Sequence, residues 1–184
     1  MDQASLRAEL QTLHRESFGW AMSCCRRDAF MAEEVLQRTY LKVLARKAVY
    51  RGSGSFRTWL FAVIRRTAQD ERRRRWLGQL RFLKYAGLTQ NRLLREERIE
   101  PGTDGGGLEL VEMLAGLSDR QVQILQLVFY HEMSLSEAAD AMGVSIGSAR
   151  THYDRAKKAI RAQLDEKGAN GPQAATHSLA GVIL

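Results

Sequence analysis

The side chains in this sequence that could do chemistry are arginines, and the chemistry open to them is phosphate binding. Six arginines fall at Arg65, Arg66 and 72–75, and only Asp70 and Glu71 bring acidic charge into that stretch. A guanidinium group is permanently charged and pairs with phosphate through two hydrogen bonds. A solvated arginine face is the alternative, but this density with so few acids favours a polyanionic partner.

A second basic segment lies at residues 145–161, which hold five basic side chains and one acid. Stepping 100° per residue predicts a helix with one narrow apolar stripe that is buried. That stripe consists of Ile146, Ala149, Tyr153, Ala156 and Ile160. The opposite face is small, polar and basic, so the helix is predicted to present it outside the protein.

The residues before this helix predict how it is held. Ser134 and Glu137 have capping-box spacing, as do Ser118 and Gln121. Gly143 is suited to end a short helix in the left-handed conformation, and Ser145 can cap the helix that follows. A short helix, a tight turn and a basic helix predict a helix-turn-helix, whose second helix enters the major groove of DNA. A helical hairpin with a solvated basic face stays open as the alternative.

Catalytic and metal-binding chemistry finds no support in the pattern. The four histidines are scattered, and there is no metal-ligand spacing, phosphate-binding loop or nucleophile motif. We therefore expect no enzyme activity, no cofactor and no metal. Cys24 and Cys25 are adjacent on a predicted helix, so we expect two free, apolar thiols and not a bridge. With no apolar run typical of a signal peptide or a membrane span, we expect a cytoplasmic protein.

The elements that must position these residues are all helices. Residues 1–75 carry 16 basic and 8 acidic side chains, and three apolar stripes there predict a bundle of three or four helices, with Ser55 capping the third stripe. Breakers such as Pro101-Gly102 and the run 105–107 predict a flexible linker over 76–107, part of which could be helical. Helical pattern returns over 108–167, and 168–184 reads as a disordered tail. The expected fold is all-α, with two small helical domains joined by a flexible linker.

Two stretches carry a resemblance to a known family. Residues 117–160, "LSDRQVQILQLVFYHEMSLSEAADAMGVSIGSARTHYDRAKKAI", resemble region 4 of bacterial sigma factors of the extracytoplasmic-function (ECF) group. Residues 32–75, which include the run "SFRTWL" and the arginines after it, are similar to region 2 of the same group. The resemblance implies a detachable subunit that directs core RNA polymerase to promoter DNA. It also implies an anti-sigma factor as a partner that holds the protein inactive.

The resemblance implies three groups of site residues. Residues of the recognition helix would read the minus-thirty-five element, and those proposed are Ser148, Arg150, Thr151, His152, Arg155 and Lys158. Residues of the first domain would hold and melt the minus-ten element, and those proposed are Tyr50, Arg51, Ser53, Ser55, Phe61, Arg65, Arg66, Arg73 and Arg74. Aromatic rings suit this task because a base that leaves the stack can stack on them. Polymerase docking falls to Leu36, Gln37, Arg38 and Tyr40.

Three positions depart from the family pattern, and two other functions remain open. Arg38 stands where an acid is common, Arg66 where asparagine is frequent, and His152 where arginine is frequent. A stand-alone helix-turn-helix regulator is one alternative, although it leaves residues 32–75 unexplained. A sigma-like decoy that binds only an anti-sigma factor is the other, although such a protein should have lost basic residues such as Arg150 and Arg155.

Overall fold

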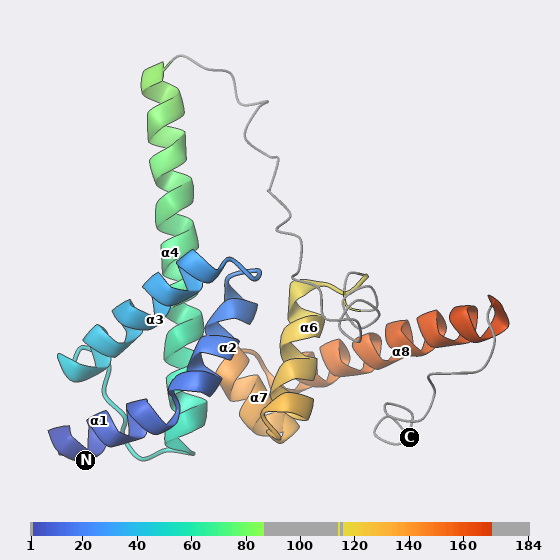
Figure 1. Ribbon diagram of the computed structural model, residues 1–184, viewed down its shortest axis with the longest axis horizontal. Helices are drawn as coiled ribbons and strands as arrows, with labels where there is room; N and C mark the ends of the chain where they lie inside the picture. The colour runs from blue at the N-terminus through green and yellow to red at the C-terminus, as the bar shows by residue number, and fades with distance from the viewer. Residues whose placement is uncertain (1, 87–113, 115, 171–184) are drawn as a thin grey trace.

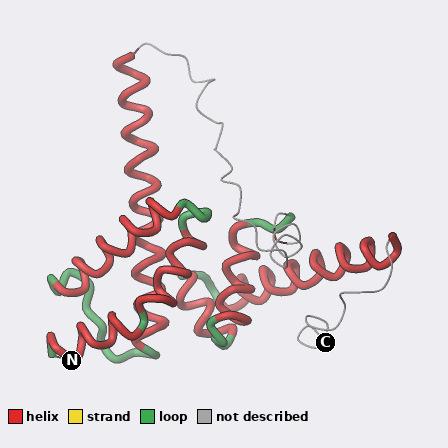
Figure 2. Tube along the Cα trace, in the orientation of Figure 1, coloured by secondary structure: helices red, strands yellow, loops and turns green. Residues whose placement is uncertain are grey.

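The computed structural model describes residues 2–86, 114 and 116–170, and every regular element in that part of the chain is helical. Four helices form the N-terminal bundle: α1 (Gln3–Thr12), α2 (His14–Cys24), α3 (Ala29–Leu44) and α4 (Phe56–Ala86). The C-terminal bundle consists of α6 (Asp119–Leu125), the short π-helix η2 (Gln126–Tyr130), α7 (Leu135–Met142) and α8 (Ile146–Asn170). Figures 1 and 2 show this arrangement, and the expected all-α fold is confirmed.

The helices begin where side chains can satisfy their first backbone N–H groups. Ser134 and Glu137 form a reciprocal capping box at α7, as Ser118 and Gln121 do at α6. The Thr58 N–H donates to Ser55 Oγ at 3.0 Å, so Ser55 caps α4. Such caps contribute about 1 kcal/mol each. All three capping predictions are confirmed.

The core of the N-terminal bundle is built around Trp20. Its side chain is fully buried, and its indole Nε1–H donates to the Phe61 carbonyl at 2.9 Å. Buried residues from α3 and α4, including Val35, Leu60 and Ile64, complete this part of the core. Cys24 and Cys25 are free and buried, as expected. Burial raises the pKa of both thiols, that of Cys25 to about 11, so both are protonated and unreactive at neutral pH.

Helix α4 is longer than the sequence pattern predicts. It runs on to Ala86 and projects beyond the bundle (Figure 1), so residues 76–86 of the predicted linker are helical. The remaining linker residues, 87–107, lie outside the described residues. Helix α8 likewise continues to Asn170, three residues into the predicted tail, and 171–184 lie outside the description. The domain limits themselves stay a prediction.

The helix-turn-helix has the expected geometry. Gly143 ends α7 with φ 59° and ψ 43°, which is left-handed, and the Ser148 N–H donates to Ser145 Oγ at 3.1 Å at the start of α8. Ala149, Ala156 and Ile160 are buried on the predicted stripe. Ile146 is an exception, since half of its surface is exposed. It is the first residue of α8.

The two bundles are packed against one another, which the predicted pair of linked domains did not include. A single hydrophobic core contains Phe61 and Ile64 from α4 together with Ile124, Ala138 and Met142 from the C-terminal bundle. Helix α7 lies against α4, and α6 lies against α2. We call this arrangement the closed form.

Polar contacts also cross between the bundles in the closed form. Arg26 Nε donates to Asp119 Oδ2 at 3.0 Å, and Gln126 Nε2 donates to the Gly19 carbonyl at 3.2 Å. Both link α2 or the turn after it to the start of the C-terminal bundle. The two bundles are therefore joined by specific contacts as well as by apolar burial.

Candidate nucleic-acid interface

The basic face of α8 is open to solvent in the closed form. Of the residues predicted to read DNA there, five are exposed, namely Ser148, Arg150, Thr151, Arg155 and Lys158, and His152 is half-buried. None of the three basic side chains in this set has an ion-pair partner within the described part of the chain. The structure therefore places them on one accessible helix.

His152 differs from its neighbours in charge as well as in exposure. Burial lowers the pKa of its imidazole, and the nearby Arg120 and Arg155 lower it further. A lowered pKa leaves the ring neutral at physiological pH, so His152 can donate or accept a hydrogen bond but adds no phosphate-binding charge. Arg120 comes from α6, outside the recognition helix. Arg120 is a candidate DNA contact that sequence analysis missed, because only the fold brings it beside His152.

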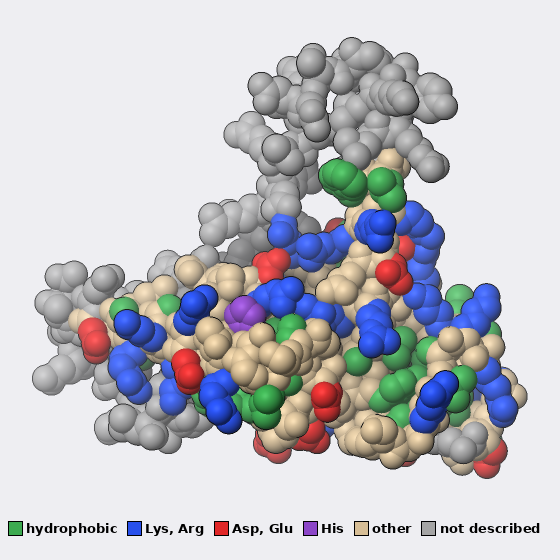
Figure 3. All heavy atoms as spheres, turned by 180° about the vertical axis from the view of Figure 1, so that it is seen from behind, with side chains coloured by type: hydrophobic (Ala, Val, Ile, Leu, Met, Phe, Trp, Pro, Cys, Tyr) green, Lys and Arg blue, Asp and Glu red, His purple; other side chains and the backbone are tan. Residues whose placement is uncertain are grey.

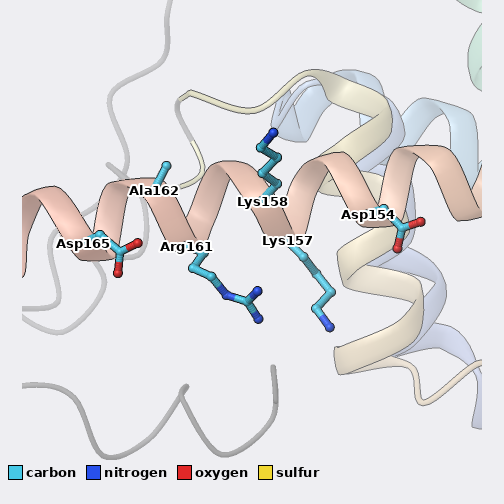
Figure 4. A pocket seen from close by; sticks show the side chains of 6 residues that line it. All are labelled: Asp154, Lys157, Lys158, Arg161, Ala162 and Asp165. Atoms are coloured by element: carbon cyan, nitrogen blue, oxygen red, sulfur yellow. The ribbon is translucent and has the colours of Figure 1, made fainter.

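A shallow pocket lies along the middle of α8. Its lining mixes three basic residues with two acids and consists of Asp154, Lys157, Lys158, Arg161, Ala162 and Asp165. Figure 4 shows Lys158 pointing to one side of the helix, and Lys157 and Arg161 to the other. Lys157 also lies over the ring of Tyr153, 5.5 Å from its centroid. Because the charges are mixed and diverge, this pocket does not define a ligand site.

An aromatic cluster stands beside the loop before α4. The ring of Tyr50 lies 5.5 Å from Phe56 and 5.6 Å from Trp59, and the latter two are 5.2 Å apart. Gly52 and Gly54 take positive φ angles of 80° and 71°, which lets the loop fold back toward Tyr50. Tyr50 donates its hydroxyl hydrogen to the Gly54 carbonyl. The rings are half-buried, and the loop residues Arg51, Ser53 and Ser55 are exposed around them.

Phe61 is not part of this surface in the closed form, where its burial excludes the predicted base contact. The side chain is fully buried, stacked on Trp20 with centroids 5.7 Å apart and met edge-on by His131 at 4.8 Å. The face of α4 that carries Phe61 is covered by the C-terminal bundle. The sequence pattern showed only that Phe61 lies off the main apolar stripe, not that a second partner covers it.

The α4 arginines divide into free and paired side chains. Arg66 and Arg73 are exposed and have no ion-pair partner within the described residues, as expected for phosphate contacts. Arg74 instead contacts the buried Glu71 at 2.8 Å. Arg65 is half-buried near Gly143, and its buried Nε has no hydrogen-bond partner among the residues that the structure describes. Figure 3, which shows the molecule from behind the view of Figure 1, shows Lys and Arg side chains gathered along α4 and across the middle of the molecule.

The predicted docking residues on α3 point in different directions. Leu36 is only 3% exposed, so it belongs to the core and cannot be a docking contact in this form. Arg38 contacts Glu34 and Glu71, each at 2.7 Å, which ties α3 to α4. Tyr40 is half-buried, with its hydroxyl 3.3 Å from His14 Nδ1. Gln37 alone is fully at the surface.

The exposed face of α3 instead carries two large apolar side chains that the predictions missed. Phe30 is 75% exposed and Leu41 is 66% exposed, and Gln37 lies between them on the helix. The spacing of 30, 37 and 41 follows one face of a helix, so the sequence held a signal for it. Apolar side chains left exposed on one face suit a protein partner better than solvent.

Comparison with known proteins agrees with this architecture. Residues 10–77 match the family model "Sigma-70 region 2", and residues 113–162 match "Sigma-70, region 4". The ECF RNA polymerase sigma factor SigF of Caulobacter vibrioides is 32% identical over 128 residues, covering 70% of this chain and 68% of that protein. The RNA polymerase sigma factor YlaC of Bacillus subtilis is 30% identical over 131 residues, covering 71% and 75%.

Two solved structures share the fold of almost the whole chain. The sigma factor RpoE of Bartonella quintana, in complex with the anti-sigma factor NepR, superposes with a TM-score of 0.63 at 20% identity, over 88% of this chain and 97% of that one. CnrH, in complex with the cytosolic domain of CnrY, gives 0.59 at 18% identity, over 92% of each chain. At such identities the likeness concerns the fold.

The helix-turn-helix and the arginine-bearing bundle thus define a two-region protein of the sigma-70 class. The chain belongs to the ECF RNA polymerase sigma factors. It is an alternative sigma factor that directs RNA polymerase to promoter DNA. Among the described helices, none is long and apolar enough to cross a membrane.

Proposed function

We propose that this sigma factor divides promoter recognition between three surfaces. The exposed face of α8, from Ser148 to Lys158, reads the minus-thirty-five element. The loop and rings around Tyr50, with Arg66 and Arg73 on α4, hold the melted minus-ten element. The face of α3 that carries Phe30, Gln37 and Leu41 docks on core polymerase. The observation that carries the proposal is that exposed arginines without an ion-pair partner among the described residues lie on separate bundles, Arg66 and Arg73 on α4 and Arg150 and Arg155 on α8.

The closed form is proposed to be the inactive form. The two promoter elements are about 25 base pairs apart, which is roughly 85 Å at 3.4 Å per base pair. In the closed form the bundles share one core, in which the rings of Phe61 and His131 are only 4.8 Å apart. Two bundles that share one core lie too close together to reach elements this far apart. Binding both elements at once therefore requires the bundles to separate.

An anti-sigma factor is the proposed partner that keeps the protein inactive, and the proposed location is the cytoplasm, where promoter DNA and polymerase are found. Support comes from RpoE, whose structure is a complex with an anti-sigma factor and whose fold extends over both bundles. A partner that binds only the closed form shifts the equilibrium toward that form. The stabilisation grows with the logarithm of the partner's concentration.

A mobility-shift experiment separates this proposal from a stand-alone regulator. The free chain should bind a promoter duplex weakly, and the complex with core polymerase should bind it specifically, since tethering two weak sites raises affinity only when both engage. Tight and sequence-specific binding by the free chain would favour the regulator instead. A chain that binds neither DNA nor polymerase, but does bind an anti-sigma factor, would favour the decoy.

A further inference from the structure

His131 occupies an unusual place in the closed form. It follows η2 in the C-terminal bundle, yet its side chain has no exposed surface and meets Phe61 of α4 edge-on, with centroids 4.8 Å apart. Tyr130, from its own bundle, meets the ring from another side at 4.9 Å. Promoter reading and polymerase docking make no use of this residue, which lies between the two bundles.

Within the described part of the chain, neither ring nitrogen of His131 has a hydrogen-bond partner. Two charged groups of the N-terminal bundle face the ring. Glu16 of α2 places Oε2 3.6 Å from Nδ1, and Arg57 of α4 contacts that same Glu16 oxygen at 3.4 Å. The carboxylate is thus already engaged by a permanent cation and is partly exposed to solvent. It offers an imidazolium ion little compensation for the loss of water.

This environment suits a neutral imidazole and not a charged one, since an ion without a dedicated partner is costly to bury. Burial lowers the pKa of His131; Glu16 acts in the opposite sense, and Arg57 adds to the lowering. Once the bundles separate, the ring returns to water and to its ordinary value near 6.5. The open form therefore binds the proton more tightly than the closed form does.

We propose that His131 is a proton-sensitive latch between the two bundles, which holds them closed when the imidazole is neutral and releases them when it is protonated. The sign follows from linkage. The stability that neutral His131 contributes to the closed form, relative to the open form, is fully present above the ordinary histidine pKa. It is lost as the pH falls below that pKa. The biological consequence, activation of the sigma factor by acid, rests on the proposed function, in which the closed form is inactive.

The test measures the shape of the full chain against pH, with no DNA or polymerase present. Small-angle scattering between pH 8 and pH 5.5 should show the radius of gyration rising with acid. Because one proton is involved, the ratio of open to closed molecules should rise by at most about tenfold per pH unit. His131→Phe fills the same aromatic site without a titrating group and should stay closed throughout. His14→Gln, which changes an exposed histidine of α2, should respond as the wild type does.

A second measurement guards against a variant that fails to fold. In the wild-type chain, the proton NMR signal of the His131 ring should titrate below the ordinary histidine range while the bundles are closed. Unchanged compaction across the pH range, an ordinary titration of His131, or acid opening of His131→Phe equal to that of the wild type would each overturn the latch. If the shape responds as expected but transcription does not follow it, the latch stands and the inactive role of the closed form fails.

Discussion

At the scale of single residues, Arg155 is the side chain best placed to read a base. It is exposed on the basic face of α8 and has no ion-pair partner in the described structure. We expect Arg155→Ala to relax preference at one position of the minus-thirty-five element by about 1–3 kcal/mol. The measurement is open-complex formation on a panel of promoters that vary at each position of that element. An equal loss on every promoter would show that Arg155 binds phosphate instead.

Two neighbouring arginines on α4 should behave differently although their sequence context is alike. Arg73→Ala should weaken opening on all promoters and reduce the salt dependence by roughly one unit, since Arg73 is exposed and has no ion-pair partner in the described ranges. Arg74→Ala should instead lower the free energy of unfolding by about 1–2 kcal/mol, because it withdraws one hydrogen bond from the buried Glu71 carboxylate. Salt titrations of open-complex formation and urea unfolding of both variants measure the two effects. Identical behaviour of the pair would contradict the division.

The limits of sequence reasoning are clearest at this scale. The helical period alone placed the residues of α8 on the exposed face, because the buried stripe of that helix packs against α6 and α7 of its own bundle. Phe61 and Leu36 were predicted to make contacts at the surface, but both are buried in the closed form. The helical period gives the direction of a side chain but not which other element covers it. In the sequence, Arg74 and Arg73 look equally suited to bind phosphate. The pairing of Arg74 with Glu71 becomes apparent only in the structure, where Glu71 is buried.

At the scale of elements, α3 should separate docking from stability. Phe30→Ala and Leu41→Ala remove exposed apolar side chains, so unfolding should change by less than about 0.5 kcal/mol while affinity for core polymerase falls roughly tenfold or more. Leu36→Ala empties a core position and should cost about 2–5 kcal/mol of stability. Titration of core polymerase with each variant, beside thermal unfolding, makes the comparison. Full polymerase affinity in both surface variants would remove docking from this face.

The turn between α7 and α8 offers a matched test of backbone conformation. Gly143 has φ 59°, and a Cβ added there would lie 3.9 Å from the Arg65 guanidinium, an ordinary contact. Gly143→Ala should therefore destabilise the helix-turn-helix by about 1–2 kcal/mol through the left-handed conformation alone. Gly78→Ala, on the projecting part of α4 where an added Cβ meets nothing, should be neutral or slightly stabilising. Chemical denaturation of both variants decides between strain and crowding.

Elements were the most predictable level of the structure. Caps at Ser55, Ser118 and Ser134 and the left-handed Gly143 follow from local chemistry, which acts within a turn or two of the chain. The extension of α4 past residue 75 did not follow, because Trp76 and Leu77 break the arginine pattern that had marked the end of the bundle. Both side chains are exposed, so tertiary packing does not explain the extension either.

At the scale of the whole molecule, closure of the two bundles is the feature that sequence could not supply. Ala138 and Met142 lie on an apolar face of α7 that any helix-turn-helix must bury. Their spacing does not indicate that α4 is the helix that packs against this face. The contacts from Arg26 to Asp119 and from Gln126 to Gly19 join residues about a hundred positions apart. Such pairs depend on the folded arrangement of both bundles and leave no local pattern.

The central claim is that this chain makes RNA polymerase initiate at particular promoters, and run-off transcription tests it most directly. Core polymerase would be supplied with the wild-type chain, Arg155→Ala or Arg73→Ala on genomic promoter fragments. We predict discrete transcripts that require the wild-type chain, a changed choice of promoters with Arg155→Ala, and a uniform, salt-dependent reduction with Arg73→Ala. Transcription that core polymerase carries out equally well without the chain would contradict the claim.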